Sequence, residues 1–204
     1  MKITKKSIIY SAKIVKNGGV IIYPTDTAYA LGADPHNKKA VARIYKIKGR
    51  FKSKPLPVIA ASLSMVRRFF KLNNHELELV KKYWPGPLSL ILEFRIKNYE
   101  LRKLHSNILQ NVGMTSLAVR VPDEPTARRL SKLLGGPIVS TSANISGAGE
   151  CYSAQEVYQQ FKNKKYQPDL ILDGGKLLRR QPSTIIKVGK KGKILVLRKG
   201  PIKI

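Results

Sequence analysis

The stretch GGVIIYPTDTAYALGA, residues 18–33, combines the clearest fold signal in the chain with an unusual group of polar side chains. Its apolar run VII predicts a buried strand over residues 20–24, which begins after a pair of glycines. Thr25, Asp26 and Thr27 follow where the strand leaves the core. A turn alone does not need two hydroxyls and a carboxylate, so this strand end is a candidate place for ligand binding.

Helix-like and strand-like patterns alternate on either side of this strand, as is typical of an α/β protein. The length of 204 residues favours a single domain over residues 1–204. We predict a mixed sheet flanked by helices, and we find no regular pattern in segment 96–113. Helices are expected at residues 4–17, 38–47, 62–71, 74–83, 125–134 and 153–161, and further strands at 57–61, 88–94, 116–121, 137–141, 169–173, 183–188 and 193–198.

The charge balance is far from neutral. Lys and Arg total 39 against 12 acidic residues, which gives a formal net charge of +27. A chain this basic attracts polyanions, so nucleic acid, nucleotide phosphates or an anionic membrane surface are candidate partners. A composition rich in Lys and Ile can also reflect genomic bias, and composition alone leaves both explanations open.

The single cysteine, Cys151, excludes an intrachain disulfide and a zinc site built from cysteines. The N-terminal residues contain no apolar core of a signal peptide. No run approaches the ~20 apolar residues of a membrane helix. We therefore expect a soluble, cytoplasmic protein with no membrane partner.

Small hydroxyl and amide residues gather at three predicted strand ends. Ligands of open α/β sheets bind in a crevice beyond the strand ends, and three clusters of one chemical type can supply directional hydrogen bonds to one pocket. The same residue types cap helices and form turns, which remains the alternative for any single cluster. The clusters contain Thr25 and Thr27, then Ser140, Thr141, Ser142 and Asn144, and finally Ser183 and Thr184.

The stretch KIKGRFKSK, residues 46–54, carries a cation at every second position. Cations held near one another repel, so they suit a ligand with several negative charges, such as a triphosphate or a nucleic-acid backbone. A solvated loop of an already basic protein is the alternative. The cations are Lys46, Lys48, Arg50, Lys52 and Lys54.

Two arginines lie within otherwise apolar strands. Arg120 follows LAV and Arg198 follows ILVL. Because burying an unpaired guanidinium is costly, such an arginine either has a partner, faces a ligand or points to the solvent side of its strand.

Several catalytic signatures are absent. The sequence contains no G-x-x-x-x-G-K-[ST], no G-x-S-x-G and no H-E-x-x-H. His36, His75 and His105 are scattered, and no acidic partner for Asp26 is evident. A catalytic site here would act by positioning substrates and stabilising developing charge.

The motifs taken together resemble the YrdC/TsaC family of L-threonylcarbamoyladenylate synthases, in its short bacterial-type form. The resemblance spans about residues 7–201, and the motifs occur in the family's order. They are YPTDTAYALGAD (23–34), IYKIKGR (44–50), KPLPVIAA (54–61), WPGPLSLIL (84–92), LAVRVPD (117–123), PIVSTSANISG (137–147), PSTIIKV (182–188) and LRKG (197–200).

The resemblance implies a twisted open sheet with a concave basic surface. It also implies a reaction in which L-threonine, bicarbonate and ATP give threonylcarbamoyl-AMP and pyrophosphate. Mg²⁺ would arrive on the ATP, without a dedicated protein metal site. Proteins of a transferase complex would then use the product to make threonylcarbamoyladenosine (t6A) in tRNA, and binding of tRNA or double-stranded RNA is expected.

The resemblance also implies roles for individual residues. Thr27, Arg120 and Ser183 would hold the threonine or its carbamate. Lys48 and Arg50 would be catalytic and would grip the phosphates. The expected ATP contacts are Lys48, Arg50, Lys54, Ser142, Asn144 and Arg198.

The sequence departs from the family pattern at three positions. Ala30 stands where glycine is usual, so the turn expected there must accept a Cβ atom. Phe51 replaces a common proline, and Ile59 stands where some long forms have a histidine near the threonine site.

Two other functions compete with the synthase. One is a non-catalytic protein that binds tRNA or double-stranded RNA, or that associates with the ribosome. The other is carbamoyl transfer in metallocentre assembly, although the zinc-finger and acylphosphatase-like parts of such proteins are not found in the sequence.

Overall fold

The computed structural model describes residues 1–51, 53–95 and 115–204. Their nine strands form one mixed sheet in the order β7-β1-β2-β6-β3-β5-β4-β8-β9. The irregular segment 96–113, with His105, lies outside the described residues, as does Lys52. The strands are β1 (Ile21–Pro24), β2 (Tyr29–Ala33), β3 (Val58–Ile59), β4 (Leu88–Glu93), β5 (Ser116–Arg120), β6 (Ile138–Ser142), β7 (Leu170–Ile171), β8 (Thr184–Val188) and β9 (Ile194–Arg198).

Helices lie against this sheet, and their ends follow from the sequence. Thr4 caps the first helix and Asn73 the fourth, in each case with a reciprocal bond from the third helical residue. Gly49, with a left-handed φ of 58°, ends the second helix. The helices are α1 (Lys5–Lys16), α2 (Lys38–Lys48), α3 (Leu63–Phe69), α4 (Asn74–Tyr83), α6 (Pro125–Leu134) and α7 (Ala154–Phe161), with a short 3₁₀ turn, η1 (Lys190–Gly192), between β8 and β9.

The second strand is the main element that sequence reasoning missed. The chain reverses after Pro24, and Tyr29–Ala33 runs back antiparallel to β1 before pairing with β6. Ala30 therefore lies inside a strand and not in a turn, and it is 4% exposed. The departure from glycine at this position is accommodated because an extended strand accepts a Cβ atom without strain.

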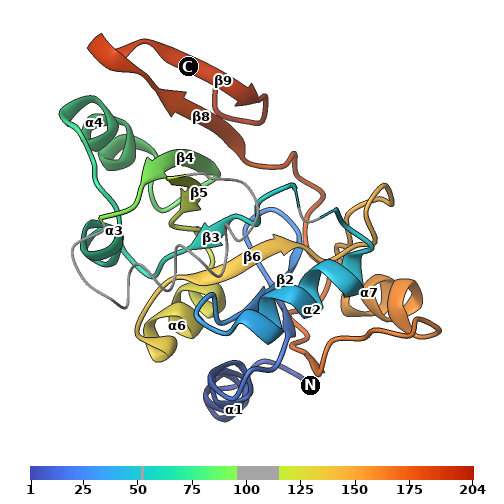
Figure 1. Cartoon of the computed structure of the whole chain (residues 1–204). Helices are drawn as coiled ribbons and strands as arrows, with labels where there is room; N and C mark the ends of the chain where they lie inside the picture. Colours follow the sequence, from blue (N-terminus) through green and yellow to red (C-terminus); the bar gives the residue numbers. More distant parts are fainter. Residues whose placement is uncertain (52, 96–114) are drawn as a thin grey trace.

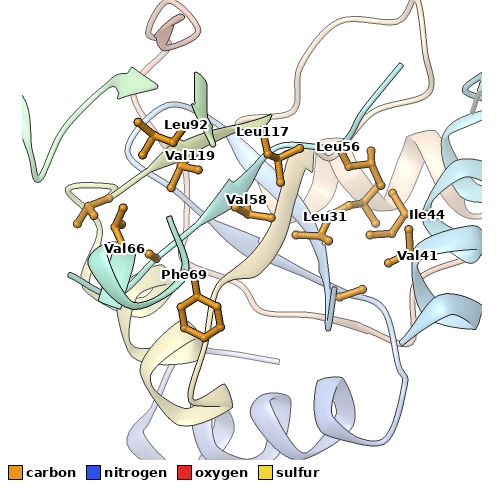
Figure 2. Packing of buried hydrophobic residues seen from close by; sticks show 14 of the residues in the cluster. Leu31, Val41, Ile44, Leu56, Val58, Val66, Phe69, Leu92, Leu117 and Val119 are labelled. Carbon is orange, nitrogen blue, oxygen red and sulfur yellow. The ribbon is translucent and has the colours of Figure 1, made fainter. Parts of the chain in front are cut away.

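Two hydrophobic clusters cover the two faces of the central strands. Ile21 and Tyr23 of β1 pack with α1 and α6, whereas Ile22 lies in the cluster on the opposite face. Figure 2 shows the larger cluster, in which Leu31 lies near Ile44 of α2. Because β1 is buried on both faces, its sequence is continuously apolar instead of alternating.

The prediction of a mixed sheet flanked by helices is confirmed, although strands 57–61 and 169–173 shrink to two residues each. The concave basic surface stays a prediction. At one end of the sheet the β8–β9 hairpin extends beyond the helices (Figure 1). None of the helices in the described ranges is long and apolar enough to cross a membrane.

Candidate functional site

A cavity of about 500 Å³ lies beside the central strands and brings together residues from distant parts of the sequence. The β1–β2 turn, the loop after α2, strand β5, the end of β6 and the β8–β9 hairpin all contribute to its wall. Seven of the nine predicted site residues line it, namely Thr27, Arg50, Lys54, Arg120, Ser142, Ser183 and Arg198. Lys48 and Asn144 do not.

The β1–β2 turn is held by a threonine side chain. Thr25 Oγ1 donates to the Ala28 carbonyl oxygen at 2.7 Å and accepts the backbone N–H groups of Thr27 and Ala28 at 3.2 and 3.3 Å. The Thr25 hydroxyl therefore holds the turn, and both Thr25 and Thr27 line the cavity. Asp26, which lies between them, is buried in an ion pair, so the three polar residues after β1 have different roles.

Arg120 and Asp26 form a buried ion pair. Arg120 Nη1 lies 2.6 Å from Asp26 Oδ1, and the two side chains are 9% and 3% exposed. Asp26 Oδ2 also accepts the backbone N–H of Asp123 at 3.2 Å. The solvent-facing alternative for Arg120 is therefore excluded. The partner of Asp26 is thus Arg120 at the end of β5, and no spacing in the sequence indicated this pairing.

Ser183 lies at the centre of a second polar contact. Arg198 donates from Nε to the Ser183 carbonyl oxygen at 2.9 Å and from Nη2 to the Ser183 hydroxyl at 2.8 Å. That hydroxyl is also 2.9 Å from the hydroxyl of Ser89. Ser89 lines the cavity but was not a predicted site residue; its only sequence signal was a serine inside the apolar strand LSLIL.

The regular spacing of cations in residues 46–54 does not produce one cationic loop. Lys46 and Lys48 belong to the last turn of α2, where Lys46 Nζ lies 5.3 Å from the centre of the Tyr166 ring. Arg50 and Lys54 line the cavity. Among the described residues of this run, the left-handed Gly49 separates a helical part from a loop part, and the binding of a polyanion by the run stays a prediction.

Lys48 is fully inside the protein, with 2% exposure. Its Nζ donates to the carbonyl oxygen of Ser142, to that of Asn144 at 2.8 Å and to Asn144 Oδ1 at 3.1 Å. Burial lowers the pKa of Lys48 to about 8, and the nearby Arg50 cation acts in the same direction. Lys48 thus ties the end of α2 to the segment after β6, and its predicted contact with phosphates stays a prediction.

Asn144 is occupied within the same loop. Its Oδ1 accepts the Ser142 hydroxyl at 2.6 Å, and its Nδ2 donates to the Ile145 and Ala148 carbonyl oxygens. The side chain therefore fixes residues 142–148 in a compact turn. Its predicted nucleotide contact is likewise untested.

Arg50 bends back over its own loop. Its Nε and Nη2 each lie 3.4 Å from a backbone oxygen, those of Lys54 and Pro55. The Tyr45 hydroxyl donates to the same Lys54 oxygen at 3.1 Å. The loop that carries both cavity-lining cations is therefore anchored to α2 at its base.

Glu150 is the one acidic side chain among the described residues that line the cavity. Its Oε2 accepts the Tyr152 hydroxyl at 3.3 Å. The neighbouring Cys151 is completely buried, and burial raises the pKa of its thiol to about 11, with a further contribution from the Glu156 carboxylate. Sequence reasoning missed Glu150 because no predicted motif includes it.

The described ranges contain no group of three or more His, Cys, Asp or Glu side chains that could hold a metal ion. His36 and His75 do not line the cavity. Within the part of the chain described, the site therefore offers hydroxyl groups and cations, which suit anions and a small polar molecule.

Comparisons of the sequence with known proteins find similar ones in several organisms. A protein of Methanocaldococcus jannaschii is 34% identical over 200 residues, which cover 98% of this chain and 88% of that protein. A threonylcarbamoyl-AMP synthase of Pyrococcus abyssi is 34% identical over 189 residues, and this chain spans about half of its length, 52%. A threonylcarbamoyl-AMP synthase of Psychromonas ingrahamii is 38% identical over 154 residues, 74% of this chain and 76% of that protein.

Solved structures of similar proteins have the same fold. The crystal structure of P. abyssi Sua5 complexed with L-threonine matches 98% of this chain with a TM-score of 0.82 and 32% identity, and this chain covers 56% of it. The crystal structure of E. coli YciO matches 97% of this chain, with a TM-score of 0.81, 30% identity and 90% coverage of that chain. A family model, Sua5/YciO/YrdC, described as "Telomere recombination", matches residues 13–200. The chain therefore belongs to the Sua5/YciO/YrdC family.

Proposed function

We propose that this chain is a threonylcarbamoyl-AMP synthase, which performs the first step of t6A formation in tRNA. The observation that carries the proposal is the meeting of hydroxyl groups and cations around one cavity. Relatives that bear this enzyme name support the reaction, and the Sua5 structure with bound L-threonine supports the amino acid. The hydroxyl-bearing residues are Thr27, Ser142 and Ser183, and the cationic residues are Arg50, Lys54, Arg120 and Arg198.

The reaction has two bond-forming steps. The amine of threonine attacks CO₂ derived from bicarbonate, loses a proton and becomes a carbamate. A carbamate oxygen then attacks the α-phosphorus of ATP, the bond to the β-phosphate breaks, and pyrophosphate leaves. Because both reactants of the second step are anions, cations around them lower the electrostatic cost of their approach.

The cavity contains side chains that could bind each substrate. Arg120 would bind the carboxylate or carbamate, because a guanidinium donates two parallel hydrogen bonds to such groups. Thr27 and Ser183 would orient the threonine. Arg50 and Lys54 would bind the phosphates, with Mg²⁺ entering on the ATP as part of the substrate.

A test of this proposal measures pyrophosphate release by the purified chain. We expect release only when threonine, bicarbonate and ATP are all present, and mass spectrometry should find a product that contains the carbon of ¹³C-bicarbonate. Omission of any one substrate should reduce release to the background. Equal release without threonine would contradict the proposal, and RNA binding with no release at all would favour the non-catalytic alternative.

We further propose that the partners are tRNA or double-stranded RNA and the proteins of a t6A transferase complex. The product is threonylcarbamoyl-AMP, an activated adenylate, so a second enzyme would transfer its threonylcarbamoyl group to tRNA and release AMP. The net charge of +27 supports an RNA partner.

Titration of labelled tRNA at increasing salt concentrations tests the RNA partner. Because binding releases counterions, we expect the association constant to fall on the order of 10³-fold between about 50 and 200 mM salt. A stem-loop without modified bases serves as the control ligand. An association constant that does not change with salt would contradict binding through the phosphate backbone.

A further inference from the structure

We propose that Asp26 is a positioning residue that holds the Arg120 guanidinium in the orientation needed for an amino-acid carboxylate. The inference rests on the proposed function, in which Arg120 binds threonine or its carbamate. The residues that carry it belong to three separate segments. These are the β1–β2 turn, the end of β5 and the turn that precedes α6.

The geometry of the pair supports this role. Asp26 Oδ1 accepts Arg120 Nη1 at 2.6 Å, and Asp26 Oδ2 accepts the Asp123 backbone N–H at 3.2 Å. Both carboxylate oxygens are therefore used, and the carboxylate cannot rotate without losing a bond. Since the Asp26 side chain is only 3% exposed, water cannot easily replace either partner.

Within the described residues, Arg120 retains donors for a ligand. Its hydrogen bond to Asp26 engages Nη1, whereas neither Nε nor Nη2 donates to an acceptor among the described residues. The side chain lines the cavity. A guanidinium fixed at one nitrogen presents the remaining donors in a planar fork that matches a carboxylate.

The backbone around the pair is also constrained. Arg120 lies opposite Ile59 in the β3–β5 ladder, and its carbonyl oxygen accepts the Ala60 N–H at 2.9 Å. On the other side, Thr25 fixes the turn that carries Asp26 through its hydrogen bonds to residues 27 and 28. The two side chains therefore meet because well-anchored elements carry both, and Arg120 lines the cavity whereas Asp26 does not.

The chain contains a matched control. Arg43 and Asp169 also form an ion pair at 2.7 Å, and Asp169 also accepts a backbone N–H, that of Val20, at 2.7 Å. Neither residue lines the cavity. Asp169→Asn thus makes the same chemical change to an Arg–Asp pair that has no proposed ligand.

The experiment compares Asp26→Asn, Arg120→Gln, the double variant and Asp169→Asn in the full chain. We expect Asp26→Asn to raise the threonine KM about tenfold, because a neutral amide no longer fixes the guanidinium. The ATP KM should change less than about twofold, and Asp169→Asn should leave both values near those of the wild type. The double variant should match Arg120→Gln within about twofold, since Asp26 acts through Arg120.

Other outcomes overturn the inference. An unchanged threonine KM in Asp26→Asn, or losses that multiply in the double variant, would show that Asp26 does not act through Arg120. If Asp26→Asn does not fold, Asp26→Glu keeps the charge and moves it by one methylene; it should still raise the threonine KM, and an unchanged value refutes the role. If the wild type itself releases no pyrophosphate with threonine, the proposed function fails. If the wild type is active but the Asp26 variants keep the wild-type threonine KM, this inference fails and the proposed function stands.

Discussion

Lys48→Met is expected to lower the thermal stability and the activity of the protein together. The substitution removes the charged donor to the buried Asn144 carbonyl oxygen and one of two donors to the Ser142 carbonyl oxygen, which keeps the Asn144 N–H at 2.9 Å. A hydrogen bond from a charged group contributes about 1.5–3 kcal/mol and a buried acceptor left unsatisfied costs about 1–3 kcal/mol, so the free energy of unfolding should fall by roughly 3 kcal/mol. For a domain of this size, such a loss lowers the melting temperature by roughly 6–12 °C.

The same change should reduce pyrophosphate release roughly 100-fold, because the segment that places Ser142 in the cavity wall loses its anchor. Differential scanning fluorimetry and a pyrophosphate assay measure the two effects. Lys46→Met is the matched control, since Lys46 lies in the same helical turn but is exposed. If Lys48 instead contacts ATP, as the resemblance implied, Lys48→Met will keep the wild-type melting temperature and lose only ATP-dependent activity.

Gly200→Ala is expected to damage the site from outside the cavity. A Cβ atom at this position would lie 2.3 Å from the Pro182 carbonyl oxygen and 2.6 Å from the Thr184 nitrogen. These are backbone atoms on either side of Ser183, so the backbone itself must move. The hydrogen bonds between Ile202 and the Thr184 hydroxyl, at 3.0 and 3.1 Å, hold this segment in place and leave little room for the shift.

Ser183 and Arg198 are hydrogen-bonded to each other, so a shift of this segment by about 1 Å should move both side chains away from the substrate. We expect kcat/KM for threonine to fall roughly 100-fold. Gly149→Ala is the control, because a Cβ atom there would have nothing within 4 Å. Steady-state kinetics of both variants, measured as kcat/KM for threonine, tests this prediction. Equal activity of Gly200→Ala and Gly149→Ala would show that the Ser183 segment tolerates the shift.

The helices were largely predictable from the sequence because their ends carry local signals. Gly18 follows α1, Gly49 ends α2 and Gly135 ends α6, each with a positive φ. The first strand was equally clear, since a run of buried apolar residues needs no partner to be recognised. Strand β2 was missed because YALGA contains two alanines and a glycine, which are weak strand formers, and only its pairing with β1 and β6 makes it a strand.

The candidate site shows a similar division. Hydroxyls at strand ends indicated where a ligand would bind, and Thr27, Ser142 and Ser183 do line one cavity. The pairing of Asp26 with Arg120 joins residues far apart in sequence, so no local pattern could reveal it. The burial of Lys48 was also unpredictable, because it depends on how the end of α2 packs against the segment after β6.

The contact between Arg198 and Ser183 bears on when the cavity is completed during synthesis of the chain. The cavity wall includes residues from Thr25 to Arg198, and Arg198 comes from β9, the last strand of the sheet. During translation the early strands leave the ribosome first, while the cavity still lacks the side that β9 supplies. A ligand that depends on Arg198 therefore cannot stabilise the nascent chain until synthesis has passed residue 198.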